Sequence, residues 1–338
     1  MTDTGLRPLN HVVAICGGSE ADRGLLAAAA GFAERNGARL TLLSVIEPPA
    51  EAKAAARAAG VSLDVALERL AEERRAHIRS FLPRDLDPRI EIRTGRRFVE
   101  VVQFAIAEQA DFVLKTAEPL AGLQRFLFSS TDHHLLRKCP CPVWLLQPDA
   151  STTQRRIVAA VDVDTQGAEE PGTLSGLNRS VLDAALRIAS GPDTTVDALH
   201  AWDAAGEDLI RRWSDDPHAQ AAAQDYAATA QNRRAGALGD LVDEAAARAA
   251  ASGLTAPRVL PRLERGGARR IIPEWLGKVE AETLVIGTVA RTGVLGVIIG
   301  NTSEDILNSV ACSVVAVKPP GFVSPIAPLP SSAGTPSR

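Results

Sequence analysis

The chain has few cysteines and no excess of positive charge. Only four cysteines occur among 338 residues, at positions 16, 139, 141 and 312. They are too few and too scattered for the disulfide framework of a small secreted protein. The net charge of -4 leaves no basic surplus to neutralise phosphates, so we expect no nucleic-acid partner. These features favour a cytoplasmic protein.

Long hydrophobic segments are also absent. No apolar run approaches the roughly 20 residues needed to span a bilayer, and the start, MTDTGLRPLN, lacks the basic and apolar regions of a signal peptide. Apolar residues make up 46% of the chain and charged residues 23%, as is usual for globular proteins. We therefore expect no membrane span, and a hydrophobic core in each of two domains.

The common catalytic and metal-binding motifs do not occur. The sequence has no P-loop with lysine, no G-x-S-x-G, no H-E-x-x-H and no G-x-G-x-x-G. Cys139 and Cys141 form a lone C-x-C, with His133 and His134 close by in sequence. The interpretation of these cysteines as buried residues at the start of a strand is favoured over their interpretation as zinc ligands. We therefore predict neither a metal nor catalytic residues.

The same order of apolar and polar segments occurs twice. Residues 110–147 and residues 281–318 each run through an apolar strand, a loop, a polar helix cap, a short helix and a second apolar strand. Apolar strands alternate with amphipathic helices through the rest of both halves, which indicates a parallel sheet with helices on both faces. The predicted fold is α/β, with two tandem doubly wound parallel-sheet domains.

The predicted domains cover residues 1–150 and residues 151–320, and a tail rich in proline and serine covers residues 321–338. The composition of the tail predicts disorder. The second domain is longer than the first, and we assign its extra residues to loops at residues 165–178 and 203–220. The last strands, residues 142–146 and 313–317, are expected edge strands. Their pairing would join the halves into an internal pseudo-dimer, and the sequence leaves a homodimer of whole chains open.

Three loops of the second half are expected to meet at the carboxyl ends of its strands. Asp162 follows the first strand, Ala201 and Trp202 follow the second, and a loop that begins at Gly287 follows the fourth. Ligands of open parallel sheets bind at this edge, where the strand order reverses. Gly287 allows a ligand to approach the backbone closely, and the Asp162 carboxylate can accept a hydrogen bond from a ribose hydroxyl or an adenine amine.

The end of this loop has the features of an anion site. Residues 300–303, Gly-Asn-Thr-Ser, present backbone N–H groups and hydroxyls at the start of a predicted helix, and Arg291 can add a positive charge. Asn301 and Glu304 also fit a capping box, a structural role that leaves the N–H groups available. In the first half, Lys115 stands at the position of Gly287, where we expect its side chain to fill the former pocket.

The loop resembles the nucleotide loop of the universal stress protein family, and more narrowly that of its tandem, E-type branch. Nucleotide-binding members carry G-x2-G-x9-G-[ST] after the fourth strand. This chain keeps the spacing, with Ala290 at the second glycine and Asn301 at the serine or threonine. GTVARTG, IGNTSEDIL, DFVLKTA and TDHHLLRKCPCPVW also resemble the E-type branch, and the resemblance covers nearly the whole chain.

The resemblance implies a cytoplasmic stress-response protein that binds ATP or a related adenosine compound. Adenine and ribose would contact Val161, Asp162 and Ala201. The positions expected at the phosphates are Gly287, Val289, Ala290, Arg291, Gly300, Asn301, Thr302 and Ser303. A nucleotide with fewer phosphates, such as ADP or AMP, fits more easily because Ala290 and Asn301 add bulk where phosphates approach. Any ATP hydrolysis would be weak, because no general base or metal ligand can be named.

Two functions from different classes stay open at this point. The first is a stress sensor or regulator that responds to an adenine nucleotide in the second domain. The alternative is a carrier of a non-nucleotide, lipid-like ligand or a protein-interaction scaffold. The extra residues of the second half and the apolar segment at residues 294–299 motivate this alternative.

Overall fold

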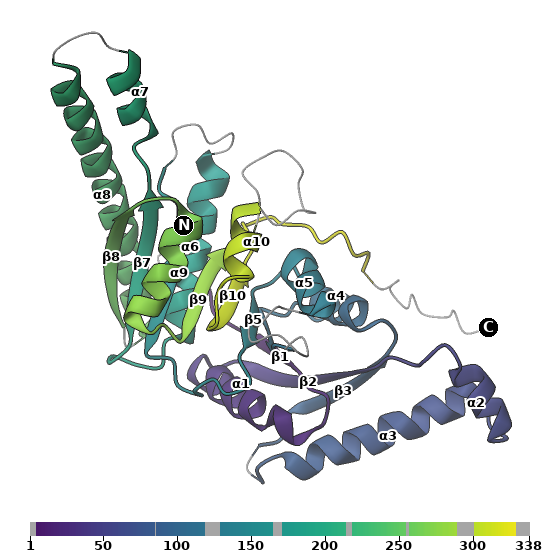
Figure 1. Ribbon diagram of the computed structural model, residues 1–338. Coiled ribbons are helices and arrows are strands. Elements are labelled where there is room, and N and C mark those ends of the chain that lie inside the picture. Colours follow the sequence, from purple (N-terminus) through teal and green to yellow (C-terminus); the bar gives the residue numbers. More distant parts are fainter. Residues whose placement is uncertain are drawn as a thin grey trace, which may run out of the picture.

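One continuous sheet runs through both halves of the chain. The computed structural model describes residues 5–84, 86–118, 129–164, 171–213, 218–254, 257–288 and 301–328. The strands in these ranges have the order β3-β2-β1-β4-β5-β10-β9-β6-β7-β8 (Figure 1). Neighbouring strands within each half are parallel, and the order reverses once in each half. This confirms the predicted pair of doubly wound α/β domains.

The strands follow the apolar segments of the sequence. Those of the first half are β1 (His11–Ile15), β2 (Arg39–Ile46), β3 (Arg89–Thr94), β4 (Phe112–Thr116) and β5 (Val143–Leu146). Those of the second half are β6 (Arg156–Ala160), β7 (Thr195–Trp202), β8 (Arg258–Arg265), β9 (Thr283–Gly287) and β10 (Ser313–Val317). Central strands such as β1 and β10 are buried along their whole length, whereas the outer strands β3 and β8 are only partly buried. Continuous apolar runs are required where helices cover both faces of a strand.

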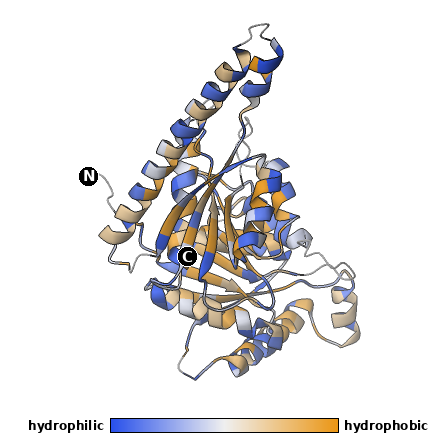
Figure 2. Ribbon diagram, turned by 60° about the vertical axis from the view of Figure 1, so that its left-hand side comes forward, coloured by the Kyte–Doolittle hydropathy of each residue, from blue (hydrophilic) through white to orange (hydrophobic). Residues whose placement is uncertain are grey.

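Helices cover both faces of the sheet. The first half contains the short η1 (Glu20–Asp22), α1 (Arg23–Arg35), α2 (Ala52–Ala58), α3 (Leu63–Phe81), α4 (Arg97–Ala107) and α5 (Ser130–Lys138). The second half contains α6 (Pro171–Ile188), α7 (Ala205–Trp213), α8 (Ala219–Ala251), α9 (Ala268–Val279) and α10 (Asn301–Leu307). One core layer includes side chains of α1, α3, α6 and α8, and the other includes side chains of α4, α5, α9 and α10. Figure 2 shows the apolar strands between helices whose outer faces are polar. Over the described ranges, no helix is both long and apolar enough to cross a bilayer.

The two halves are joined through their last strands. β5 and β10 run antiparallel, with Trp144 opposite Val315. The Gln147 side chain extends the contact by donating from Nε2 to the Cys312 carbonyl at 3.2 Å. This is the pairing that the two exposed apolar edges predict, since each edge covers the unpaired backbone groups of the other.

The extra residues of the second half are largely helical, which corrects the loops predicted at residues 165–178 and 203–220. Residues 171–178 belong to α6, which begins at Pro171, a position where the missing N–H of proline is tolerated. Residues 205–213 form α7, with acidic residues in its first turn and basic residues in its last. Figure 1 shows α7 and α8 as a hairpin that extends beyond the sheet. Residues 165–170 and 214–217 lie outside the described residues.

The first part of the C-terminal tail contacts the first half. Ile326 packs against the core layer beside α4, and Gln103 Nε2 donates to the Ala327 carbonyl at 3.0 Å. Ile326 and Ala327 therefore have defined contacts with the first half, and the disorder expected for residues 321–338 stays a prediction. Residues 329–338 lie outside the described residues.

Candidate ligand site

The candidate site lies at the carboxyl ends of three neighbouring strands. Ala160 at the end of β6 is opposite Leu199 on β7 and Ile286 on β9. The residues that follow these positions therefore lie along one edge of the sheet, where the strand order of the second half reverses. Of the predicted site residues, this edge carries Val161, Asp162, Ala201, Gly287 and Ser303, with Asn301 and Thr302 exposed at the start of α10. Val289, Ala290, Arg291 and Gly300 lie outside the described residues.

Asp162 is held in place by a buried asparagine. The Asp162 N–H donates to Asn178 Oδ1 at 2.9 Å, and Asn178 Nδ2 donates back to the Asp162 carbonyl at 2.7 Å. The Asp162 carboxylate in turn accepts from the Asp164 N–H at 3.1 Å, and the side chain is 34% exposed. Because two amide hydrogen bonds orient the backbone, a partly exposed carboxylate is presented at the sheet edge.

Gly287 has close neighbours within the protein itself. A Cβ atom at this position would lie 2.6 Å from Leu177 Cδ2 of α6, a distance that real side chains do not adopt. Gly287 does not have a positive φ, so glycine is required here by the close approach of Leu177 and not by a strained turn. Ser303 Oγ donates to the Gly287 carbonyl at 3.0 Å. This hydrogen bond brings the two ends of the loop between β9 and α10 together.

His200 supports the same edge from inside the protein. Its Nδ1 donates to the Val161 carbonyl at 3.2 Å, and the residue is 3% exposed. Burial lowers the pKa of His200 below its usual value of 6.5, because the charged ring would lose its hydration. Within the described ranges, its Nε2 has no hydrogen-bond partner. A neutral, buried ring positions the end of β6 and is poorly placed for proton transfer.

The long helix α8 is tied to the loop that follows β6. Arg234 forms an ion pair with the Asp164 carboxylate, and its guanidinium lies 5.4 Å from the centre of the Trp202 ring. The Asp164 N–H donates to the Asp162 carboxylate, so Arg234 reaches the candidate site through a single intervening residue. The arginine is only 8% exposed. Sequence reasoning missed this link.

A sequence signal for Arg234 and Asn178 exists, because both are polar residues on the apolar faces of helices. Arg234 lies one turn from Ala230 and one turn from Leu238, both of which are buried. Asn178 likewise lies one turn from the buried Leu182. A polar side chain at such a position must find a partner inside the protein, and these two residues find theirs in the loop after β6.

The equivalent region of the first half is filled by an internal ion pair. The Lys115 ammonium lies 2.9 Å from Asp132 Oδ1 and 3.0 Å from Glu118 Oε1, and it donates to the Thr116 carbonyl at 2.9 Å. The other oxygen of Asp132 accepts from the Ser129 N–H at 3.1 Å, as the third residue of a capping box does. The ammonium is thus paired within the first half, and the expectation that it fills a former pocket stays a prediction. The Asp132 carboxylate therefore already places a negative charge at the N-terminus of α5.

The cysteines and histidines of the first half do not gather around one point. The Sγ atoms of Cys139 and Cys141 are 3.5 Å apart, and both residues are buried. His134 instead stacks on Phe98, with ring centres 4.2 Å apart. Over the part of the chain that the structure describes, no three His, Cys, Asp or Glu side chains are arranged to hold a metal ion.

Comparisons with known proteins agree with this architecture. Among solved structures, a functionally unknown protein from Pseudomonas aeruginosa PAO1 aligns with a TM-score of 0.59 at 22% identity, over 92% of this chain and 93% of that chain. A universal stress protein from Archaeoglobus fulgidus aligns with a TM-score of 0.55 at 15% identity, over 92% of this chain and 99% of that chain. These two likenesses concern the fold.

Sequence comparisons name the family. Universal stress protein E of Salmonella typhi is 27% identical over 232 residues, which are 69% of this chain and 68% of the relative. The universal stress protein E homolog of Haemophilus influenzae is 24% identical over 258 residues, which are 75% of this chain and 78% of the relative. The sequence model of the universal stress protein family matches this chain twice, over residues 9–147 and over residues 155–318. The chain therefore belongs to the universal stress protein family, with two copies of its fold in tandem.

Proposed function

We propose that this chain is a cytoplasmic stress-response regulator that binds an adenine nucleotide at the carboxyl edge of its second half. The observation that carries the proposal is the contrast between the halves. In the second half, a partly exposed Asp162 carboxylate lies at the same edge as Gly287, whose carbonyl accepts from Ser303 Oγ. In the first half, Lys115 and Asp132 fill the equivalent region with an ion pair.

The residues at the edge suit a nucleoside. The Asp162 carboxylate is an acceptor that a ribose hydroxyl or the adenine amine can use, and its backbone is already oriented by Asn178. Val161 and Ala201 are apolar residues at the same edge, the first buried and the second partly buried. The Asp162 backbone is held by Asn178 without a ligand, so little ordering of this residue is needed on binding.

The surroundings of the phosphate loop favour a short phosphate chain. Leu177 packs closely against Gly287, so this side of the glycine has no room for a ligand. Ala290 adds a methyl group, and Asn301 replaces a compact hydroxyl, within the family's loop spacing. We therefore propose that AMP or ADP binds more tightly than ATP, and that the function is binding and not catalysis.

Isothermal titration of the full chain with AMP, ADP and ATP tests this proposal. We expect AMP or ADP to bind, and Asp162→Ala to weaken that binding about tenfold, because a partly buried hydrogen bond to the ligand is lost. Asn301→Ala should instead strengthen ATP binding relative to AMP, because it removes bulk where the longer phosphate chain approaches. Its matched control is Ser130→Ala at the first residue of α5, which should change nothing. No heat with any of the three nucleotides would contradict the proposal.

Native mass spectrometry of the freshly purified protein separates this function from that of a lipid carrier. A retained mass equal to that of an adenine nucleotide supports the proposal. A retained mass of an acyl-chain compound, together with no nucleotide heat, would favour the carrier instead. Asp162→Ala should release a retained nucleotide and leave an acyl-chain compound bound, because only the nucleotide uses the carboxylate.

A further inference from the structure

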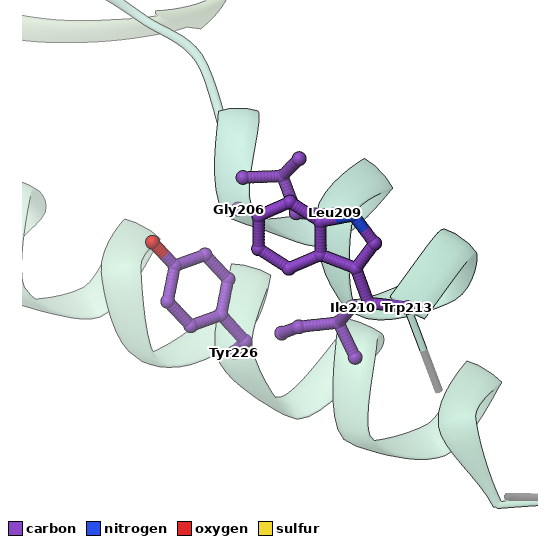
Figure 3. A pocket seen from close by; sticks show the side chains of 5 residues that line it. All are labelled: Gly206, Leu209, Ile210, Trp213 and Tyr226. Carbon is purple, nitrogen blue, oxygen red and sulfur yellow. The ribbon is translucent and has the colours of Figure 1, made fainter. Parts of the chain in front are cut away.

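An apolar groove lies between α7 and α8 on the hairpin that extends beyond the sheet. This hairpin groove is lined by Gly206, Leu209, Ile210, Trp213 and Tyr226, and it has a volume of about 470 Å³ (Figure 3). Trp213 is 78% exposed, Tyr226 46% and Leu209 41%. Three of the six large apolar side chains that are exposed among the described residues therefore lie in one place. Such a cluster on a surface marks an interaction site.

The lining of the hairpin groove suits a protein surface and not a small molecule. Its polar side-chain groups are the Tyr226 hydroxyl and the Trp213 indole N–H, whereas small-molecule sites enclose the ligand and orient it with several convergent polar groups. Tryptophan and tyrosine are the side chains that most often carry the binding energy of protein interfaces. The occupant is therefore expected to present apolar side chains of its own.

Contacts at the start of α7 fix the position of the helix that lines the groove. Gly206 lets the Tyr226 ring lie against α7, since a Cβ atom at residue 206 would be 2.6 Å from Tyr226 Cζ. Glu207, only 6% exposed, forms ion pairs with Arg211 on α7 and with Arg265 on β8. The base of α7 is thus fixed to the sheet. The exposed tryptophan is carried by an anchored helix and not by a loose end.

The charges on α7 complement a second copy of the same helix. Asp208 and Arg212 are exposed and lie one turn apart, and Leu209 and Trp213 form the neighbouring row. When two α7 helices pack antiparallel about a two-fold axis, Asp208 of each copy is opposite Arg212 of the other. The same arrangement places Leu209 of each copy opposite Trp213 of the other. A surface with this property is self-complementary, as a two-fold interface requires.

We propose that the hairpin groove binds the hairpin groove of a second copy of this chain, so that the protein forms a two-fold dimer centred on α7. Trp213 of each copy would enter the groove of the other between Leu209 and Tyr226. The two Asp208–Arg212 pairs would lie at the rim of this apolar contact and set the antiparallel direction.

Light scattering after size exclusion, with the full chain over a range of concentrations, tests the dimer. We expect a mass twice the 35.7 kDa of one chain. Trp213→Glu and Leu209→Glu should each weaken the dimer at least about 30-fold, since each buries a charge in the apolar centre. Leu70→Glu on α3 is the matched control, because Leu70 is 48% exposed and lies in the other half. It should leave the dimer intact.

A charge exchange tests the antiparallel arrangement itself. Asp208→Arg alone and Arg212→Asp alone each place like charges opposite one another, so each variant should dissociate more readily, by about fivefold. An equimolar mixture of the two variants restores both ion pairs and should form a heterodimer with the affinity of the unmodified chain. These positions are exposed, and unchanged circular dichroism of each variant would show that the fold is intact.

The alternatives give distinct results. A mass of one chain at every concentration would overturn the proposal and leave the groove for a different protein. A dimer that survives Trp213→Glu and Leu209→Glu would also overturn it, because the copies would then meet elsewhere. A mixture of the two charge variants that associates no better than either alone would exclude the antiparallel pairing of α7.

Discussion

The Lys115 ammonium lies 2.9 Å from Asp132 Oδ1, and the same two positions of the second half, Gly287 and Ser303, are also in contact. In the first half the contact is an ion pair between side chains that are 6% and 0% exposed. In the second half it is a hydrogen bond from a hydroxyl to a carbonyl oxygen, which leaves no buried charge. The same pair of positions is thus joined by an ion pair in one copy and by an uncharged hydrogen bond in the other.

Removing Lys115 should destabilise the chain more than removing the ion pair as a whole. Lys115→Met leaves the Asp132 carboxylate buried and without its partner, which typically costs about 3 to 5 kcal/mol. The double variant Lys115→Met with Asp132→Asn should recover part of this loss, because the amide can still cap α5 without a buried charge. Urea unfolding of both single variants and the double variant measures the coupling. Strictly additive effects would show that the two side chains do not depend on one another.

Gly287→Ala should destabilise the second half through Leu177. The added methyl would lie within 2.6 Å of the leucine side chain, so α6 or the leucine must move, at a cost of about 1 to 3 kcal/mol. Adding Leu177→Ala should reverse part of the effect of Gly287→Ala by making room. Gly277→Ala in α9, where the new methyl meets nothing within 4 Å, is the control and should be neutral or slightly stabilising. Thermal unfolding distinguishes these outcomes, and equal shifts for Gly287→Ala and Gly277→Ala would contradict the packing argument.

Arg234→Met should weaken nucleotide binding without removing any residue from the site. The arginine holds Asp164, which in turn donates to the Asp162 carboxylate. Its loss should loosen this loop and reduce AMP or ADP affinity by a few-fold. This is a loss of less than about 1.4 kcal/mol of binding free energy, the value of a tenfold change in Kd. Arg233→Met is the matched control, because the neighbouring side chain is 45% exposed and lies 3.9 Å from Asp164. Titration of both variants should show a clear effect for Arg234 and little or none for Arg233.

Lys318 should make stability rise with pH just above neutrality. Its ammonium is buried between the Leu136 carbonyl and the Thr288 hydroxyl, and burial lowers its pKa from 10.5 to about 7. Between these values the unfolded chain binds more protons than the folded chain. The free energy of unfolding therefore increases with pH, by up to about 1.4 kcal/mol per unit, and this dependence ends below pH about 7.

The window for observing this effect is about pH 7 to 9. Above it the thiols act in the opposite direction, because burial raises the pKa of Cys16 to about 12 and that of Cys312 to about 11, both from 9.0. Urea unfolding across the window should give a rising stability for the unmodified chain and a flatter profile for Lys318→Met. The exposed Lys53→Met should keep the slope, and a slope that survives Lys318→Met would assign it to another group.

The strands and their order were accessible from the sequence because both depend on local pattern and on repetition. Apolar β-branched runs such as residues 11–15 and 313–317 are long enough for a strand and too apolar for a surface. The repeat of the whole pattern indicated two copies of one fold, and the exposed apolar edges indicated their pairing through β5 and β10. The edge that carries Val161, Asp162, Ala201 and Gly287 follows from parallel strands alone, since all their carboxyl ends point the same way.

The hairpin of α7 and α8 was not accessible in the same way. α8 extends over residues 219–251 with alanines at many of its buried positions, so its apolar face gives only a weak periodic signal. Residues 203–220 therefore suggested a loop, and the groove between the two helices had no counterpart in the sequence. A groove depends on how two helices pack, which local periodicity does not encode.

By itself, the sequence determined the fold class, the duplication and the edge of the sheet that carries the candidate site. It did so because hydrophobic periodicity and strand direction are local properties. Only the tertiary structure decided that Leu177 lies beside Gly287, that Arg234 supports the loop of Asp162, and that Lys115 meets Asp132. These contacts join residues on different elements, so they depend on the lengths and packing of helices that become defined only when the whole chain has folded.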